Sequence, residues 1–330
     1  MWDFDILFLD TSSKKYYDYH VLEKEALGGT EATVVRIAEA LAGFGLRVAV
    51  VHSQIPYFEP MTSKHAFYFH SDDLAKITCK HYVQIRGVKN SHLYPKAKKY
   101  VWLHDAADER LKEWNPIIGE NKITVVGVSK FHRKEIKRFL FTHDVEYIYN
   151  PVQDEIYKPK DVELKYDPNT LVWAASPHKG LGKGLEIFKK IKQRLPDANL
   201  VIANPGYHNV DHVQLSAVPG VQVMGPQSCK TLWAVLQNSM CLYYPSQFDE
   251  TFGLILAEAN ALGVPMLGYQ HGVLNETVSS DDQLVEDGNE DLVLDRAVEW
   301  TKTRPKVSGR DEFRLSRVIF RWINLFAGVR

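Results

Sequence analysis

Cysteines are scarce in this chain, and long apolar segments are missing. Its 330 residues include Cys79, Cys229 and Cys241, which show neither CxxC nor metal-ligand spacing. Such a set argues against a disulfide-stapled secreted domain and suits a reducing compartment. No segment has the ~18 uninterrupted apolar residues of a membrane span, and the start MWDFDILFLD carries acids where a signal peptide needs basic residues. We therefore expect a cytoplasmic protein, with peripheral contact to a membrane as the alternative.

An excess of charge of either sign is also missing. Lys and Arg number 40 against 41 Asp and Glu, and 45% of the residues are apolar. This balance predicts a globular protein without a global preference for nucleic acid. The HExxH zinc motif is absent, and the Asp-x-Asp of Asp3 and Asp5 begins the first predicted strand, before any site could form. We expect neither a metal site nor a cofactor.

Apolar runs alternate with helical patterns throughout, which predicts an α/β fold with mostly parallel strands. The length suits two domains of about 150 residues each. Residues 150–169, rich in Pro, Asp and Lys, are the expected linker. We expect strands at 4–10, 46–52, 99–103 and 123–128 and helices at 30–43 and 130–141 in the first half. In the second half we expect strands at 171–175, 199–203, 220–224, 241–244 and 265–269 and helices at 184–194, 230–238 and 254–262.

The segment FDETFGLILAEANALGVP (residues 248–265) places two carboxylates around the start of a helix. Glu250 precedes the helix, and Glu258 lies two turns inside it. The first amides of a helix are unpaired and bind phosphate oxygens, so the start at residues 253–255 predicts a phosphate flanked by hydroxyl-rich groups. The alternative is an ordinary N-terminal charge and a solvated helix residue.

Three further motifs follow predicted strands. In LGGTEATVVRIAEALAGFG (27–45), Gly28 and Gly29 precede a helix and permit close approach of a ligand. YVWLHD (100–105) ends a strand with His104, followed by Asp105, which would orient the imidazole or cap the next helix.

The segment LVWAASPHKGLGKGLEIFKKI (171–191) runs through a glycine-rich turn that carries Lys179 and Lys183. A lysine there can neutralise a diphosphate. The turn lacks the GxGxxG spacing of dinucleotide-binding enzymes, so an oxidoreductase is disfavoured.

The Glu-x7-Glu pattern, with the PS, FG, EA and GVP residues around it, resembles the signature of GT4-family retaining glycosyltransferases (glycosyl transferases group 1, GT-B fold). The resemblance implies that Glu250 contacts the transferred sugar, that Glu258 holds the nucleotide ribose and that His104 hydrogen-bonds the donor sugar. Family members usually carry an Arg five residues before the Lys of a Lys-Gly pair. If Lys183 is that Lys, His178 takes the place of the Arg, and the sequence leaves the roles of Lys179 and Lys183 open. The expected catalytic residues are Glu250, His104, Lys183 and Lys179, and the expected donor-binding residues are Gly28, Gly29, Ser176, His178, Gly225, Pro226, Thr251, Phe252, Gly253, Leu254, Ile255 and Glu258.

The same resemblance implies two Rossmann-like, doubly wound domains facing a central cleft. We expect an acceptor-binding domain at 1–152, a nucleotide-sugar-binding domain at 153–308 and a C-terminal helix at 309–330 that packs back on the first domain. Phe313, Val318, Ile319, Trp322 and Phe326 are its expected buried positions; membrane-surface contact is the alternative role of this basic helix.

The implied enzyme is a metal-independent hexosyltransferase. It moves a sugar from a UDP- or GDP-sugar to a hydroxyl of a glycan, a lipid-linked acceptor or another acceptor, with retention of configuration. A nucleotide-sugar-binding protein without transfer activity and a nucleotide-sugar 2-epimerase of the same fold are the alternatives. An insert with Tyr16, Tyr17 and Tyr19 precedes the glycines. These tyrosines either stack on an acceptor sugar or belong to a surface loop.

Overall fold

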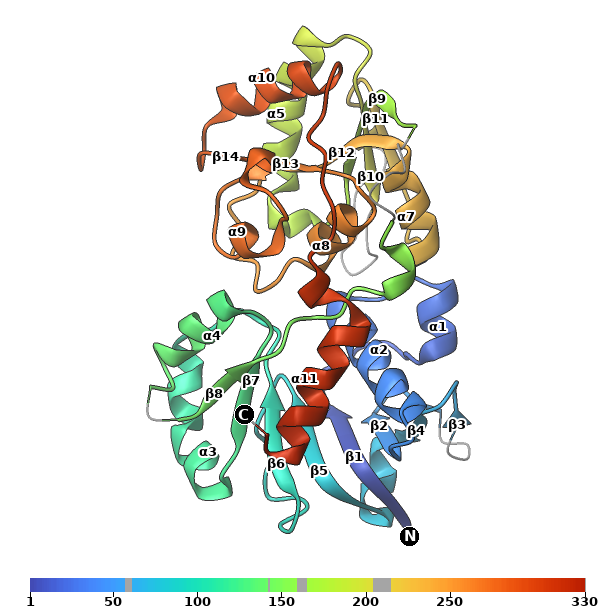
Figure 1. Cartoon of the computed structure of the whole chain (residues 1–330), viewed down its shortest axis with the longest axis vertical. Coiled ribbons are helices and arrows are strands. Elements are labelled where there is room, and N and C mark those ends of the chain that lie inside the picture. Colours follow the sequence, from blue (N-terminus) through green and yellow to red (C-terminus); the bar gives the residue numbers. More distant parts are fainter. Residues whose placement is uncertain (57–60, 142, 159–164, 204–214, 330) are drawn as a thin grey trace. The chain divides into compact units, whose positions relative to one another are not determined.

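The computed structural model describes residues 1–56, 61–141, 143–158, 165–203 and 215–329. The chain divides into two compact units (Figure 1). The first unit comprises residues 1–22, 29–151 and 314–330, and the second comprises residues 23–28 and 152–313. The chain therefore leaves the first unit near residue 151 and returns to it near residue 314, so that its C-terminal segment belongs to the first unit.

The first unit is built on a sheet with the strand order β3-β4-β2-β1-β5-β6-β7-β8. Its strands are β1 (Trp2–Asp10), β2 (Val48–His52), β3 (Met61–Thr62), β4 (Phe67–His70), β5 (Ile77–Ile85), β6 (Lys98–Trp102), β7 (Thr124–Gly127) and β8 (Val145–Tyr147). β3 is antiparallel to β4, whereas parallel ladders join β4, β2, β1 and β5 through β8. The strand order reverses between β1 and β5, and doubly wound sheets bind ligands at the carboxyl edge beside such a reversal.

Helices cover both faces of this sheet because side chains alternate along its strands. The helices are α1 (Tyr19–Lys24), which spans the boundary between the units, α2 (Gly29–Gly43), α3 (Asn115–Asn121), α4 (Lys130–Lys137) and α11 (Leu315–Ala327). Val101 of β6 shares a core cluster with Ile118 of α3 and Ile136 of α4. The next residue, Trp102, contacts Trp322 of α11 with ring centroids 4.7 Å apart. The C-terminal helix thus packs on the first sheet, and the residues expected to be buried at 318, 319, 322 and 326 are buried. Phe313 is also buried, but it precedes α11 and belongs to the second unit.

The second unit contains a sheet with the strand order β11-β10-β9-β12-β13-β14. Its strands are β9 (Asp167–Trp173), β10 (Asn199–Ala203), β11 (Val221–Met224), β12 (Ser239–Tyr244), β13 (Met266–Tyr269) and β14 (Leu284–Val285). All the ladders described between them are parallel. The order reverses between β9 and β12, so the loops after these two strands lie where a doubly wound sheet binds its ligand.

The helices of the second unit are α5 (Leu181–Arg194), α7 (Cys229–Gln237), α8 (Leu254–Ala261), α9 (Leu274–Thr277) and α10 (Glu290–Trp300) (Figure 1). A buried amide pair fixes α8. Asn260 Nδ2 donates to Gln283 Oε1 at 2.7 Å, and Gln283 Nε2 donates back to Asn260 Oδ1 at 3.0 Å. The same Gln283 oxygen accepts from the backbone of Met266 at 2.9 Å, which ties the helix to β13.

Each predicted strand and helix corresponds to an observed element, and the structure adds several described elements that were not predicted, among them β4, β5, β8, α3 and α10. β5 was not expected, because Lys80, His81 and Gln84 interrupt its apolar pattern. β9 begins at Asp167, inside the predicted linker, of which residues 159–164 lie outside the described residues. Among the described residues, none of the helices combines the length and the apolar character that a bilayer-spanning segment needs.

Candidate active site

Glu250 lies in the loop between β12 and α8, where two groups hold its carboxylate. Lys179 Nζ donates to Glu250 Oε1 at 2.7 Å, and the hydroxyl of Tyr244 donates to the same oxygen at 2.7 Å. The Glu250 side chain is only 11% exposed. The ammonium of Lys179 also lies 4.9 Å from the centre of the Phe248 ring. Lys179 follows β9 and Glu250 follows β12, so the reversal of strand order brings together two charges that are distant in sequence.

Tyr244 is a neutral hydrogen-bond donor in this cluster. Burial raises the pKa of its hydroxyl well above the ordinary value, and the negative charge of Glu250 raises it further. The ring packs against Trp173 of β9 with centroids 5.2 Å apart. The tyrosine therefore fixes one carboxylate oxygen of Glu250 from the protein interior. Tyr244 belongs to no sequence motif, and its position at the end of a predicted strand was the one signal that could have indicated it.

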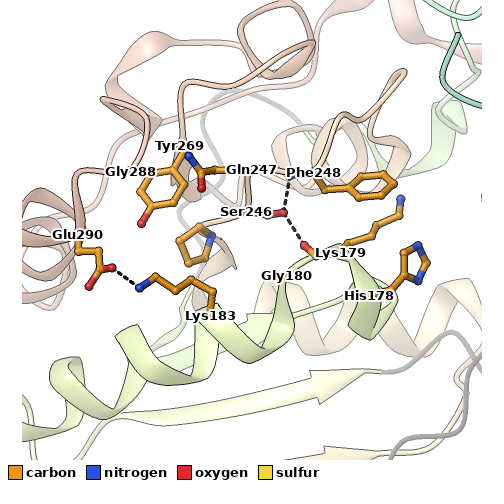
Figure 2. Close-up of a pocket in the computed structure, with 11 residues that line it drawn as sticks. His178, Lys179, Gly180, Lys183, Ser246, Gln247, Phe248, Tyr269, Gly288 and Glu290 are labelled. Carbon is orange, nitrogen blue, oxygen red and sulfur yellow. Dashed lines mark hydrogen bonds and ion pairs between the residues drawn. The ribbon is translucent and has the colours of Figure 1, made fainter. Parts of the chain in front are cut away.

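A cavity of about 500 Å³ adjoins this cluster (Figure 2). The two candidate lysines occupy different parts of it. Lys183 Nζ lies 2.6 Å from Glu290 Oε1, and this hydrogen bond raises the pKa of Lys183. The lining residues are His178, Lys179, Gly180, Lys183, Pro245, Ser246, Gln247, Phe248, Tyr269, Gly288 and Glu290. Both lysines thus line the cavity, but only Lys179 contacts Glu250 among the described pairs.

Ser246 joins the two loops that form this cavity. Its Oγ donates to the carbonyl oxygen of Lys179 at 2.5 Å and accepts from the backbone of Phe248 at 3.1 Å. Gly180 follows Lys179 with a φ of +100°, and a Cβ there would lie 3.2 Å from Ser246 Oγ. The glycine turn is therefore required by both its backbone conformation and its close contact with the neighbouring loop. Gly182 of the same motif has open space around it.

The start of α8 depends on Gly253. This residue has a φ of +74°, and an added Cβ would lie 2.2 Å from Leu256 Cδ1. The preceding carbonyl, that of Phe252, accepts a hydrogen bond from Thr277 Oγ1 at 2.5 Å, and the Phe252 ring packs against Phe313. The side chain of Phe252 is thus part of the core, so only its backbone could contact a nucleotide-sugar donor.

We expect Gly253→Ala to lower the free energy of unfolding by at least about 2 kcal/mol, because left-handed strain and overpacking add together. Thermal denaturation measures the change. The matched control is Gly182→Ala in the first turn of α5, where nothing approaches the added Cβ. There alanine should be neutral or stabilise the protein by up to about 1 kcal/mol. Equal melting temperatures for the two variants would contradict this account of Gly253.

Glu258, the second carboxylate of the motif, is buried rather than solvated. Its side chain accepts a hydrogen bond from the indole nitrogen of Trp233 at 3.0 Å, and the residue is 4% exposed. The alternative of an ordinary solvated helix residue is therefore wrong. Trp233 lies on α7, which follows the loop of Gly225 and Pro226 at the carboxyl end of β11. Gln227 Nε2 donates to the carbonyl of Gly225 at 3.0 Å, which shapes that loop.

The remaining predicted residues of the second unit surround the glycine turn and α8. Ser176 is buried and precedes a 3₁₀ turn at Pro177–Lys179. The ring of His178 packs edge-on against Phe248, with centroids 5.6 Å apart. Leu254 and Ile255, in the first turn of α8, are half-buried, as is Thr251 before it. These residues therefore lie at the same carboxyl edge of the second sheet as Lys179 and Glu250.

His271 connects the loop of Glu250 to the loop after β14. Its Nε2 lies 3.0 Å from Asp249 Oδ1, and its Nδ1 lies 3.0 Å from Asp287 Oδ2. Asp249 is the residue before Glu250. The imidazole thus limits the movement of the loop that carries the first glutamate.

In the first unit, His104 is buried just beyond the end of β6. Its ring lies 4.5 Å from that of Trp102. Burial lowers the pKa of His104 well below its ordinary value, and the charge of Arg86 and the nearby His132 lower it further. The imidazole is therefore neutral near pH 7. Asp105 does not cap the next helical turn, because Asp108 does so by accepting from the backbone of Arg110 at 2.9 Å.

The glycines of the GGTE motif lie at the start of α2. Gly28 is buried, and Gly29 is exposed as the first residue of the helix. Tyr17 of the preceding insert is buried, stacks on His52 with centroids 4.2 Å apart and donates to Asp10 Oδ2 at 3.1 Å. Tyr17 is therefore a core residue, and neither predicted role, sugar stacking or surface loop, applies to it.

Within the described ranges, no group of three or more His, Cys, Asp or Glu side chains has the arrangement of a metal site. Asp5, near the start of β1, forms an ion pair with Lys80 at 2.8 Å, and Asp3 accepts from Thr78 at 2.8 Å. His208 and His212 have the HxxxH spacing of a pair of metal ligands on one helix face, but they lie outside the described residues.

The sequence and the fold both resemble known glycosyltransferases. A family model for glycosyl transferases group 1 matches residues 161–309. The structure of sucrose-phosphate synthase from Thermosynechococcus elongatus superposes with a TM-score of 0.71 at 15% identity, covering 98% of this chain and 99% of that one. Anabaena Alr3699/HepE, solved with UDP and glucose, gives a TM-score of 0.70 at 15% identity over 98% of this chain and 100% of that one.

A third similar structure is AviGT4, a glycosyltransferase of avilamycin A biosynthesis. It gives a TM-score of 0.64 at 16% identity and covers 98% of each chain. No curated protein sequence matches this chain significantly. These structural similarities establish the GT-B fold. With a glycosyl transferases group 1 match at residues 161–309 and the GT-B fold, this protein is a glycosyltransferase.

Proposed function

We propose that this glycosyltransferase belongs to the retaining GT4 enzymes and transfers a hexosyl group from a UDP- or GDP-sugar to an acceptor hydroxyl. The observation that carries this proposal is the contact between Lys179 and Glu250 at the strand reversal of the second sheet. A cation that can neutralise a diphosphate thus lies beside a carboxylate that can contact a sugar, which supports the proposal. The structures of Anabaena Alr3699/HepE in complex with UDP and glucose and with UDP-glucose support a nucleotide-sugar donor.

In this proposal the second unit binds the nucleotide diphosphate. The backbone amides of Gly253 to Ile255 lie at the start of α8. They would donate to phosphate oxygens at the positive end of the helix dipole. An ammonium group has three hydrogen-bond donors, so Lys179 can hold Glu250 and phosphate oxygens together. Glu258 and Trp233 are the proposed ribose contacts, and the loop of Gly225 and Pro226 is the proposed contact for the base.

Retention of configuration follows from attack on the same face as the leaving group. The acceptor oxygen forms a bond to the anomeric carbon as the bond to the β-phosphate oxygen breaks. That phosphate oxygen leaves with the bonding electron pair and takes the acceptor proton, so no separate protein base is required. Glu250 offsets positive charge that develops on the sugar ring, and neutral His104 hydrogen-bonds a sugar hydroxyl. Helix amides and lysine neutralise the diphosphate in this scheme, without a metal ion or cofactor.

The proposed acceptor is the hydroxyl of a glycan, a lipid-linked sugar or another small molecule. We place the protein in the cytoplasm, with peripheral contact to a membrane as the alternative if the acceptor is lipid-linked. Vesicle sedimentation with and without anionic lipid separates these two cases.

Incubation with a panel of UDP- and GDP-hexoses, followed by analysis of both products, tests the proposed function. A retaining transferase releases nucleoside diphosphate, and its glycoside keeps the donor's anomeric configuration by NMR. Without an acceptor it slowly releases the unchanged sugar. An unchanged donor would indicate a binding protein, and UDP with an epimerised free sugar would indicate a 2-epimerase. Inverted product would contradict the retaining mechanism.

A further inference from the structure

Arg86 occupies the ligand-binding edge of the first sheet. It directly follows β5, which pairs with β1 on one side and with β6 on the other. The strand order of this sheet reverses between β1 and β5. Ligands of doubly wound sheets bind beside such a reversal, at the carboxyl ends of the strands. Arg86 therefore lies at the strand reversal of the first sheet, as Lys179 and Glu250 lie at the strand reversal of the second.

The backbone of Arg86 is strained. Its φ is +61°, in the left-handed region, and its N–H donates to the carbonyl of Trp102 at 3.0 Å. A residue with a side chain other than Asn, Asp or Gly pays about 1–2 kcal/mol in this conformation. The next residue is Gly87, so a glycine is close by, yet the left-handed position carries a guanidinium. Strain of this kind is concentrated at functional sites. The contacts of the Arg86 side chain give a reason for the strained backbone.

The guanidinium of Arg86 joins the two motifs that the sequence indicated in the first unit. One terminal nitrogen donates to Thr30 Oγ1 at 2.5 Å, in the first turn of α2. Its other terminal nitrogen lies 3.6 Å from Glu31, and Nε lies 3.4 Å from Asp105. A planar guanidinium spans three partners in different directions, which a lysine ammonium on a flexible stem does not. Arg86 is 24% exposed and Glu31 only 12%, so their pair is partly shielded from solvent, whereas Asp105 is 68% exposed and its ion pair with Arg86 contributes less.

We propose that Arg86 is a positioning residue that fixes the GGTE start of α2 against the His104–Asp105 loop. The inference rests on the proposed function, because His104 and Gly29 owe their ligand roles to it. Arg86 itself acts through these residues. Without the guanidinium, the helix start and the histidine loop lose their common anchor, and the histidine meets the sugar in a less fixed geometry.

Arg86 also influences the charge of His104. Burial is the main cause of the lowered pKa of His104, and Arg86 from the end of β5 and His132 from α4 lower it further. Burial lowers the pKa of His132 to about 4, so His132 is neutral and Arg86 is the charged one of these two groups. Loss of Arg86 removes a repulsion, so the pKa of His104 rises toward its ordinary value. If neutral His104 is the active form, the acid limb of the pH profile moves to higher pH.

The test compares Arg86→Asn, Arg86→Lys and the matched control Lys122→Asn. Lys122 also has a left-handed backbone, with a φ of +51°, but it ends α3 and is exposed. Asn tolerates this conformation, so both Asn variants remove a cation without new strain. Donor hydrolysis and transfer should fall at least tenfold in kcat/KM for Arg86→Asn and stay unchanged for Lys122→Asn. Thermal melting of all variants shows whether they remain folded under the assay conditions.

The lysine variant separates charge from geometry. Arg86→Lys should restore the acid limb of the pH profile while recovering only part of kcat/KM. Wild-type kcat/KM and pH profile in folded Arg86→Asn would overturn the inference, as would full rescue by lysine. If the wild-type protein turns over no nucleotide sugar, the proposed function fails. NMR titration of His104 in wild type and Arg86→Asn then tests Arg86 without activity: an unchanged histidine pKa and unchanged Thr30 and Asp105 amide shifts would overturn its role.

Discussion

Glu250→Gln is expected to lower the turnover of nucleotide sugar at least tenfold, which corresponds to about 1.4 kcal/mol of activation free energy. Glutamine has nearly the same shape and can still accept from Tyr244, but it cannot offset positive charge on the sugar ring. It also removes the ion pair with Lys179, whose nitrogen lies 2.7 Å from the carboxylate. Because that charge develops in the transition state, kcat should fall more than KM changes. Steady-state kinetics with the best donor measures both constants.

Glu186→Gln is the matched control for this substitution. Glu186 lies on α5, its side chain is 65% exposed, and it forms an ion pair with Lys183 at 3.5 Å. An exposed pair of this kind contributes little, so the kinetic constants should remain those of the wild type. Wild-type kcat in Glu250→Gln would remove Glu250 from the mechanism. A loss of the same size in both variants would indicate a general effect of charge on the second unit.

Lys179→Ala is expected to lower kcat/KM by more than tenfold and to exceed the loss caused by Lys183→Ala. Its ammonium contacts Glu250 and lies over Phe248, so removing it affects the sugar-binding carboxylate and the diphosphate together. Lys183 has a side chain that is 55% exposed and forms its closest ion pair with Glu290 at 2.6 Å. The motif alone gave the two lysines equal standing, whereas the contacts favour Lys179. Kinetics and calorimetric titration with nucleoside diphosphate quantify each loss.

Lys190→Ala controls for the loss of a cation near this cavity. Lys190 also pairs with Glu290 at 2.6 Å, and it is not among the residues that line the cavity. The Lys190→Ala variant should bind nucleoside diphosphate with the affinity of the wild type. If Lys183→Ala proves as damaging as Lys179→Ala, both lysines hold the diphosphate, as the sequence-based expectation had them. If only Lys183→Ala is damaging, our assignment of Lys179 is wrong.

Much of the fold follows from local sequence patterns. The predicted strands at 199–203 and 265–269 correspond to β10 and β13, because short apolar runs bounded by polar turns form buried parallel strands. The left-handed φ of +74° at Gly253 likewise agrees with a helix predicted to start there. β5 was not predicted, because its polar side chains interrupt the apolar pattern by which a buried strand is identified. It is nevertheless central in its sheet, where its backbone pairs with β1 and β6.

The candidate site divides in the same way. The residue types and spacing of Glu250, Glu258 and Lys179 predicted a site for a phosphate flanked by hydroxyl-rich groups. Tyr244, Ser246 and Arg86 carried no motif of their own, and their contacts with the motif residues appear only where strands from distant parts of the chain end at one edge. The spacing of Glu258 left a solvated helix residue as an alternative, and its burial and its hydrogen bond from Trp233 rule that alternative out.

The sequence by itself determined the α/β class, most of the helix and strand positions, and the nature of the groups that the site would contain, because periodicity, glycine requirements and residue chemistry are local properties. Only the tertiary structure decided which of these polar and charged side chains contact one another. Lys179 and Glu250 are 71 residues apart, and Arg86 and Thr30 are 56 apart, yet each pair is in contact. Parallel strands bring the ends of distant segments to one edge of a sheet, and no spacing along the chain states which ends will be neighbours.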